Sequence, residues 1–251
     1  MPSVVTKADM ESGLRGLGVH LGMALEVHSS LSSFGSVAGG AETVIEALLQ
    51  KVGCDGAVVM PAFKLSPPQP PDEADRALGI VSKIKILEGN EPHSGMGLIA
   101  DTFRRHPDVI AGEGMLSVCA WGKDAKLHAD SGFGRIIDTD GWALLLGVDI
   151  YRLSAMHYVE DALPREITDI FKPSAEAVRR YPEGEWLIEC GAPPVRAWYT
   201  IQRRAYERGF IREGRIGDAT CRFFKVREVI GLYRDALQSD PLGLYGLKQT
   251  I

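Results

Sequence analysis

Two histidines in the sequence stand beside residues that could make them catalytic. In the segment MHYVED (156–161), Glu160 follows His157 by three residues and Asp161 follows it by four. On a helix either spacing brings a carboxylate next to the imidazole. A neighbouring carboxylate fixes the tautomer of a histidine and raises its basicity, which suits a general base. We therefore predict a catalytic pair of His157 and Glu160; the alternative is a surface histidine among solvated acids.

The second histidine, His28, directly follows the apolar run ALEV (24–27), which predicts a buried strand. In α/β folds the residues just beyond a parallel strand face the site crevice, so we predict that His28 is catalytic as well. The alternative is a half-buried structural histidine. Ser29 and Ser30 do not favour a serine hydrolase, because the G-x-S-x-G motif of a nucleophile elbow is absent. No ligand spacing indicates a metal, so we expect no zinc site at His28 and His157.

A loop of small residues, SSLSSFGSVAGGA (29–41), joins this strand to a predicted helix. The first turn of a helix has free backbone N–H groups and the positive end of the helix dipole, so it favours anions. Gly39 and Gly40 let a ligand come close to the backbone. Neither a P-loop nor the dinucleotide fingerprint is present. The segment predicts a phosphate- or pyrophosphate-bearing ligand beside His28, with an ordinary strand–loop–helix connection as the alternative.

Hydrophobic periodicity indicates the elements that must hold these residues. In the first half it predicts a helix capped by Thr6, a strand over 24–27, a helix from Ala41, and a strand over 57–60. Strand, helix and strand in this order form a βαβ unit, which is parallel and right-handed. A proline-rich loop follows over 62–75, then a helix over 98–105 and buried strands over 115–120 and 142–148.

The last third is less regular. We predict a strand pair from Trp186–Cys190 and Pro194–Trp198, an Arg-rich helix over Tyr199–Arg208, and a final amphipathic helix from Val226 to Leu237. The whole pattern predicts one α/β domain over residues 1–251, three-layer-like, with a mixed, largely parallel central sheet flanked by helices and elaborated in its C-terminal half.

Composition narrows the classes of protein. The 251 residues carry a net charge of −5, which argues against nucleic acid as a partner and permits a cationic substrate. Four scattered cysteines without C-x-x-C spacing indicate neither a metal site nor a disulfide framework. No run of apolar residues is long enough to span a membrane, and the charged first residues do not resemble a signal peptide. We expect a cytoplasmic protein without a membrane partner.

Several motifs, in order, resemble the aminoglycoside 3-N-acetyltransferase family, which lies outside the common N-acetyltransferase superfamily. They are VHSSLSSFG-x-V-x-GGA, GMGLIADTFRRHPDV, SVCAWG, GWALLLGV, MHYVED and IGDATCRFFKVREVIGLY. The resemblance implies acetyl-CoA as co-substrate, transfer to the 3-N amine of an aminoglycoside, and antibiotic resistance. It implies His157 as general base in a ternary complex, and a need for His28.

The resemblance also implies a set of binding residues. Those that correspond to the family's acetyl-CoA site are Ser30, Leu31, Ser32, Ser33, Val37, Gly40, Ala41 and Ser117. Asp101 stands where the family often has Glu, and we expect Asp101 and Asp161 to attract the cationic amine.

Three segments depart from the family's pattern. The Asn-Thr that precedes the family's catalytic histidine is absent, with Leu153 and Ser154 nearby instead. Residues 111–115 lack its Ser-x-His-Pro motif, and its F-G-x-x-S-P-L-x-R-L motif is shortened at 133–138. These departures leave two alternatives open, an acetyltransferase of the same chemistry for a non-antibiotic amine and a non-catalytic CoA binder. The oligomeric state stays open too, with a homodimer as one option.

Overall fold

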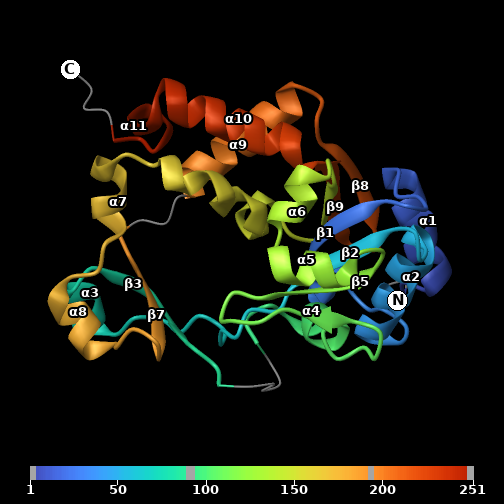
Figure 1. Cartoon of the computed structure of the whole chain (residues 1–251), viewed down its shortest axis with the longest axis horizontal. Coiled ribbons are helices and arrows are strands. Elements are labelled where there is room, and N and C mark those ends of the chain that lie inside the picture. Colours follow the sequence, from blue (N-terminus) through green and yellow to red (C-terminus); the bar gives the residue numbers. More distant parts are fainter. Residues whose placement is uncertain (1–3, 89–93, 192–194, 248–251) are drawn as a thin grey trace.

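A seven-stranded sheet forms the core of the main body, in the right half of Figure 1. Its strands lie in the order β4-β5-β2-β1-β6-β9-β8, and a separate two-stranded sheet pairs β3 with β7. The computed structural model describes residues 4–88, 94–191 and 195–247. The strands are β1 (Ala24–Ser29), β2 (Ala57–Pro61), β3 (Ile80–Lys85), β4 (Ile110–Ala111), β5 (Val118–Gly122), β6 (Trp142–Leu146), β7 (Trp186–Cys190), β8 (Arg212–Ile216) and β9 (Ala219–Lys225).

Helices follow or connect most of these strands. The α-helices are α1 (Lys7–Leu17), α2 (Gly40–Val52), α3 (Glu73–Ala77), α4 (Leu98–Phe103), α5 (Ala125–Ser131), α6 (Gly134–Asp138), α7 (Arg165–Phe171), α8 (Ala175–Arg180), α9 (Val195–Glu207), α10 (Val226–Ser239) and α11 (Pro241–Leu244). The 3₁₀-helices are η1 (Leu31–Phe34), η2 (Ile150–Arg152) and η3 (Ser154–Ala162).

The three central strands of the large sheet are parallel. β1 pairs with β2 on one side and with β6 on the other, both in parallel. The outer strands β5, β4, β9 and β8 all join in antiparallel pairs. The predicted α/β fold with a mixed sheet and a parallel core is thus confirmed. Because parallel strands end at the same edge, the residues that follow β1, β2 and β6 are brought together there.

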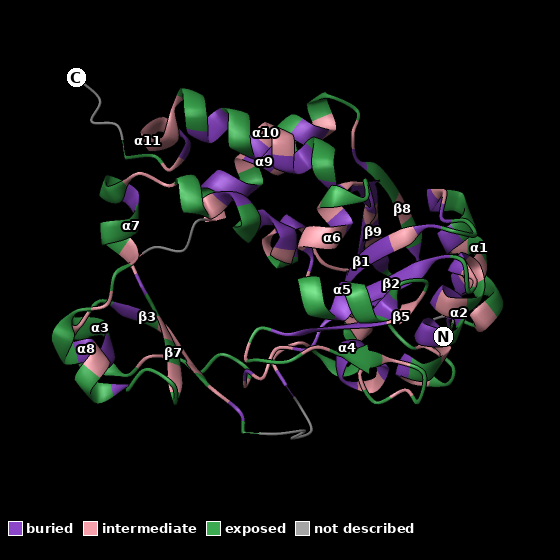
Figure 2. Cartoon of the chain, in the orientation of Figure 1, coloured by how far each residue is buried: buried purple, intermediate pink, exposed green. Residues whose placement is uncertain are grey.

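Helices cover both faces of this sheet. One core cluster joins α1, α2 and α4 to side chains such as Leu25 and Val27 of β1. A second cluster, on the opposite face, joins α5, η3, α9 and α10 to side chains such as Ala143 and Leu145 of β6. Figure 2 shows buried residues along the central strands and on the inner sides of these helices. Because side chains alternate along a strand, Glu26 and His28 share the second face.

The N-terminal βαβ unit follows the local signals closely. α1 begins after Thr6, whose hydroxyl accepts from the Asp9 N–H, while the Asp9 carboxylate accepts from the Thr6 N–H, so both free donors are satisfied. α2 begins after Gly39, which has φ of 77°, a left-handed backbone conformation that favours glycine.

The predicted strand pair in the last third is wrong. Trp186–Cys190 is a strand, β7, but its partner is β3, a hundred residues earlier in the chain. Residues from Val195 onward belong to helix α9, and Pro194 lies outside the described residues. The helix forms because its apolar residues recur at helical spacing and are buried on one side: Ala197, Trp198, Ile201 and Ala205.

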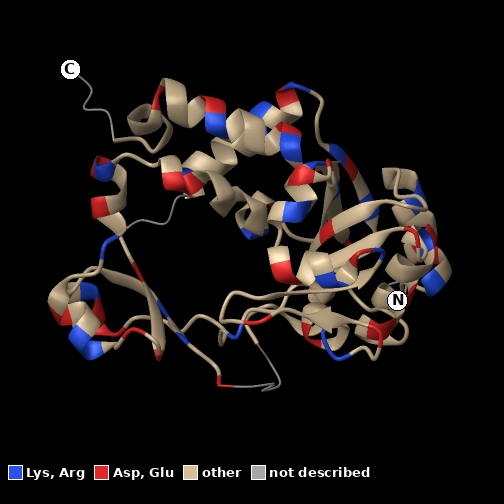
Figure 3. Ribbon diagram, viewed as in Figure 1, with Lys and Arg blue, Asp and Glu red and all other residues tan. Residues whose placement is uncertain are grey.

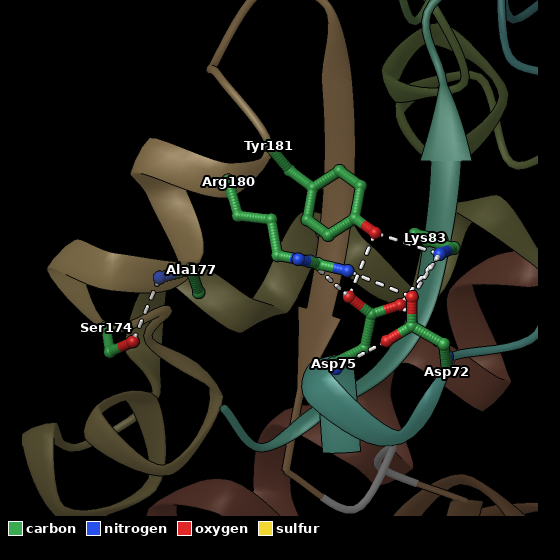
Figure 4. A network of polar contacts seen from close by, with 7 residues as sticks. All are labelled: Asp72, Asp75, Lys83, Ser174, Ala177, Arg180 and Tyr181. Carbon is green, nitrogen blue, oxygen red and sulfur yellow. Dashed lines mark hydrogen bonds and ion pairs between the residues drawn. The ribbon is translucent and has the colours of Figure 1, made fainter. Parts of the chain in front are cut away.

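β3 and β7 belong to a small lobe with α3 and α8, at the left of Figure 1. A polar network around the buried carboxylate of Asp75 fastens it (Figure 4). Lys83 Nζ donates to Asp75 Oδ2 at 2.7 Å, while Arg180 Nε and Tyr181 Oη donate to Oδ1, each at 2.9 Å. These bonds tie α3, β3 and the end of α8 together, because the acceptor Asp75 belongs to α3 while the donors come from β3 and from the C-terminal end of α8.

Candidate active site

A cavity of about 1340 Å³ lies at the edge where the three parallel strands end. Its floor includes residues at or just after those ends, namely His28 of β1, Pro61 of β2 and Gly147 after β6. The opposite wall comes from the small lobe, through Leu187 and Glu189 of β7. Cavities that hold one small molecule measure roughly 300–1,000 Å³. The space is therefore sufficient for a large ligand or for two ligands together.

His157 and Glu160 form a close pair on the rim of this cavity. His157 Nδ1 lies 2.6 Å from Glu160 Oε2. Both residues belong to η3, a 3₁₀-helix, in which side chains three residues apart eclipse each other. Asp161, one position further on, is rotated away and exposed, which explains why Glu160 is the partner. The carboxylate accepts from Nδ1–H, so in a neutral imidazole the lone pair is on Nε2, which has no partner among the described residues.

The second oxygen of Glu160 faces the protein interior. Glu160 Oε1 accepts from Trp198 Nε1 and from Tyr233 Oη, each at 3.3 Å. Tyr233 Oη lies 2.6 Å from Tyr245 Oη. Burial raises the pKa of Tyr245 to about 12 and raises the pKa of Tyr233 further, so both phenols remain protonated and able to donate at neutral pH. Glu160 is thus held on one side while its other oxygen orients His157.

The second histidine lies beside a carboxylate as well. His28 Nε2 is 2.9 Å from Glu26 Oε1 and 3.3 Å from the backbone nitrogen of Ser154. The side chain of His28 is 6% exposed and that of Glu26 is 0% exposed, whereas the side chain of His157 is 63% exposed. His28 contributes to the cavity lining, and its ring is tilted against Phe133 at 5.6 Å between centroids. The cavity therefore contains one exposed and one buried histidine–carboxylate pair.

Five of the eight residues predicted for the acetyl-CoA site line the cavity. They are Ser30, Leu31, Ser32, Val37 and Gly40. Gly40 is the first residue of α2, so the free N–H groups of that helix begin at the cavity wall. Nothing lies within 4 Å of where a Cβ of Gly40 would be, which leaves the approach to the helix start open.

The other three predicted residues do not line the cavity. Ser33 donates from Oγ to the Gly147 carbonyl at 2.9 Å and thereby ties the loop to the end of β6. Ala41, the second residue of α2, is buried in the core that this helix forms with the sheet. Ser117 is buried and donates to the Ala62 carbonyl at 3.2 Å, while its neighbours Leu116 and Val118 line the cavity.

The two acids predicted to attract the amine also lie off the cavity lining. Asp101 is buried and accepts from the backbone N–H of Ser94 at 2.8 Å and from its hydroxyl at 2.7 Å. It also lies 3.3 Å from Arg104 Nε. The loop that begins at Ser94 supplies Gly95 to the lining, so Asp101 is connected to the cavity through this loop.

Several residues of the site do not follow from the sequence patterns described above. Glu26 was passed over as part of an apolar run, although a charged residue inside such a strand is itself a signal, since buried carboxylates are rare without partners. Trp198 was placed in a strand that does not exist. Tyr158 and Glu189 line the cavity from η3 and β7, and nothing local in the sequence indicates that these elements meet.

The cavity lining carries few charges. Among the described lining residues Glu189 is the acidic side chain and Arg152 the basic one, apart from the histidines. Figure 3 shows acidic and basic residues interspersed over the outer helices. In residues 4–88, 94–191 and 195–247, no group of three or more His, Cys, Asp or Glu side chains is arranged to hold a metal ion. Within the same ranges, no helix has the length and apolar character needed to cross a membrane.

Comparisons with known proteins agree on one family. The sequence model described as aminoglycoside 3-N-acetyltransferase matches residues 27–238. The chain is 28% identical over 262 residues to YokD of Bacillus subtilis, a prophage-derived aminoglycoside N(3')-acetyltransferase-like protein, across 90% of this chain and 89% of YokD. It is 27% identical to aminoglycoside N(3)-acetyltransferase IV of Salmonella, across 94% of this chain and 88% of that enzyme.

Solved structures show the same fold. The apoenzyme of aminoglycoside acetyltransferase AAC(3)-IVa superposes with a TM-score of 0.71 at 23% identity, covering 98% of this chain and 92% of that one. The structure of YokD superposes with a TM-score of 0.69 at 24% identity, covering 95% of each chain.

Proposed function

Because the chain belongs to the aminoglycoside 3-N-acetyltransferase family, we propose that it transfers the acetyl group of acetyl-CoA to the 3-N amine of an aminoglycoside. The observation that carries this proposal is the pair on the cavity rim, with His157 Nδ1 at 2.6 Å from Glu160 Oε2. With Nδ1–H bonded to Glu160, the lone pair of a neutral His157 is on Nε2, beside a cavity that is large enough for two ligands. Relatives support the choice of ligands: a structure of AAC-IIIb contains CoASH, and one of AAC-VIa contains sisomicin.

Acetyl-CoA would bind along the loop that precedes α2. Ser30 and Ser32 offer hydroxyls, with Oγ atoms 3.2 Å apart, and the start of α2 at Gly40 offers backbone N–H groups and a positive dipole. The open approach to Gly40 fits a phosphate group there. We assign Leu31, Val37 and the buried Ser33, Ala41 and Ser117 supporting roles around this ligand.

His157 would act as the general base. An ammonium group cannot attack a carbonyl, so Nε2 of His157 removes a proton from the substrate amine, directly or through water. The amine nitrogen then bonds to the thioester carbon, and the carbonyl oxygen becomes an oxyanion. His28 donates a hydrogen bond to this oxygen. The carbon–sulfur bond breaks as the carbonyl re-forms, and the attacking nitrogen releases its second proton to solvent. The CoA thiolate leaves and takes up the proton that His157 had removed from the ammonium group. No covalent enzyme intermediate is required.

The remaining predicted residues would act around this centre. We propose that Asp161, exposed next to Glu160, attracts the cationic substrate, and that Asp101 shapes its site through the loop at Ser94. We also propose that residues 1–251 act as one domain, because the cavity draws its lining from Val27 through Trp198. Acetylation would remove a positive charge from an aminoglycoside, and antibiotic resistance would follow from it.

The charge of the cavity supports a second candidate substrate. An aminoglycoside carries several ammonium groups, yet the described lining offers Glu189 as its acid and sets Arg152 against it. An amine with fewer positive charges would fit the nearly neutral lining of this cavity better. The second candidate is therefore the same acetyl transfer to a less cationic, non-antibiotic amine.

One assay tests both candidates. Release of the CoA thiol is followed spectrophotometrically with acetyl-CoA and a panel of aminoglycosides and simple amines. Turnover with an aminoglycoside, and acetylation at its 3-N position by mass spectrometry and NMR, is the expected result. Turnover with simple amines alone supports the second candidate. Calorimetric binding of CoA without thiol release for any amine would overturn both and leave a CoA-binding protein.

A further inference from the structure

Glu26 is a carboxylate in an apolar part of the sheet. It lies in β1, the central strand, directly opposite Val59 of β2 and Ala143 of β6. Its Oε1 contacts His28 Nε2 at 2.9 Å and accepts from the Ala155 N–H at 3.1 Å. Its Oε2 is buried and has no hydrogen-bond partner among the described residues. An isolated buried charge is costly, so the pair of Glu26 and His28 is stable when it is neutral as a whole.

A neutral pair can place its shared proton in two ways that keep the short contact. Either the proton is on Nε2, which makes an imidazolium facing a carboxylate, or it is on Oε1, which donates to Nε2. In both arrangements Nδ1 of His28 carries a hydrogen. A proton on Glu26 Oε2 would leave a buried hydroxyl without an acceptor, which costs roughly 1–3 kcal/mol. The Ser154 N–H, 3.3 Å from Nε2, also favours a hydrogen on Nδ1, because it donates to Nε2 and so favours a lone pair there.

We propose that Glu26 is a positioning residue that keeps a hydrogen on Nδ1 of His28, so that His28 serves as a hydrogen-bond donor in the cavity and not as a second base. Nδ1 has no partner in the described chain, and His28 is part of the cavity lining. The charged or titratable groups that line the same space are His157, Arg152 and Glu189, together with the phenols of Tyr151 and Tyr158. The inference rests on the proposed function, in which His28 donates to the thioester oxygen.

Two substitutions at Glu26 separate this role from simple filling of space. In Glu26→Gln, the Ala155 N–H fixes the amide oxygen at the position of Oε1, which is 2.9 Å from Nε2 in the wild type. This acceptor outweighs the longer 3.3 Å contact with the Ser154 N–H, so the hydrogen lies on Nε2 and Nδ1 loses it. We expect kcat to fall by about 10²-fold, the effect of losing one oxyanion donor. In Glu26→Leu no oxygen remains, the Ser154 N–H still donates to Nε2, and Nδ1 keeps its hydrogen. We expect a smaller fall of about tenfold, because Nδ1 keeps its hydrogen while the ring loses the contact with Oε1 that positions it.

The tautomer itself is read by NMR of ¹⁵N-labelled histidine in the full chain without substrate, with the signal assigned by its loss in His28→Ala. We expect protonated Nδ1 in the wild type and in Glu26→Leu, and unprotonated Nδ1 in Glu26→Gln. Val58→Ala, a core substitution on the neighbouring strand with no side chain in the cavity, is the control. It should lower the thermal midpoint and leave both the tautomer and kcat unchanged.

Two outcomes would overturn the proposal: an unprotonated Nδ1 in the wild type, or a Glu26→Gln variant no slower than Glu26→Leu. A role in filling space predicts the second outcome, because Gln matches Glu in shape. If the wild type releases no thiol with any amine, the proposed function fails, while the NMR spectra still decide the tautomer of His28.

Discussion

His157 with Glu160 and His28 with Glu26 are the same pair of residue types in opposite surroundings. The first pair lies on a 3₁₀-helix at the rim of the cavity, where the imidazole is 63% exposed and its carboxylate is supported by Trp198. The second lies in the central strand of the sheet, where the imidazole is 6% exposed and the carboxylate is buried with one oxygen unpartnered.

The difference shows how exposure assigns chemical roles. At the rim, water and substrate can exchange protons with Nε2, so the pair is suited to take a proton up and pass it on. In the sheet, the cost of a buried charge keeps the pair neutral and fixes where its hydrogens lie. A general base must change its protonation state during turnover, whereas a hydrogen-bond donor must keep its hydrogen. Three substitutions test this contrast, and a fourth tests what holds the small lobe in place.

The largest effect is expected for His157→Ala. Loss of the general base should lower kcat by about 10³-fold while the affinity for CoA, measured by calorimetry, is unchanged. Because the imidazole is exposed, added imidazole should restore part of the rate. The defect should also shrink at high pH, where the substrate amine is already deprotonated. Normal turnover of the variant would remove His157 from this role.

His28→Ala should lower kcat by about 10²-fold, the effect of one lost donor to the oxyanion. Here added imidazole should give little or no rescue, because the His28 side chain is only 6% exposed, against 63% for His157. The defect should be the same at every pH, since no proton is transferred at this residue. Rescue by imidazole, or a defect that vanishes at high pH, would mean that the two histidines do not differ as described.

Tyr233→Phe removes one of the donors to Glu160 and keeps the ring in the core. A typical hydrogen bond contributes about 1 kcal/mol, so kcat should fall by about fivefold. Tyr245→Phe is the matched control, because Tyr245 contacts Tyr233 and not Glu160 itself. An equal or larger loss in Tyr245→Phe would show that Glu160 is held in some other way.

Asp75→Asn should have the smallest effect on catalysis and a clear effect on stability. The pKa of Asp75 lies well below its ordinary value of 3.8, because hydrogen bonds outweigh the burial that would raise it; the donors are Lys83, the Asp72 backbone, Tyr181 and Arg180. A lowered pKa stabilises the fold above pH 4 or so, and this stabilisation is lost as the pH falls. The variant should therefore unfold more easily than the wild type at pH 7, with the gap narrowing towards pH 3 in denaturant titrations. A constant gap would show that the carboxylate's charge is not what holds the lobe.

The sequence predicted the parts of the fold that depend on local signals. Caps and periodicity were sufficient for the helix after Thr6 and for the βαβ unit around His28, and the three-residue spacing was sufficient for the contact between His157 and Glu160. The pairing of β3 with β7 was missed because it joins segments a hundred residues apart, and strand pairing at that distance leaves no local pattern. The role of Glu26 was missed because its burial depends on the neighbouring strands β2 and β6, which local sequence does not reveal.

The loop before α2 is bonded to β6 at two points: the Ser30 N–H donates to the Leu146 carbonyl, and the Ser33 hydroxyl donates to the Gly147 carbonyl, each at 2.9 Å. A loop held in this way has little conformational freedom left to lose when a ligand arrives. If CoA binds along this loop, as proposed, its association should be limited by diffusion and orientation, without a slow ordering step. Its observed rate constant should rise in proportion to ligand concentration, with no plateau.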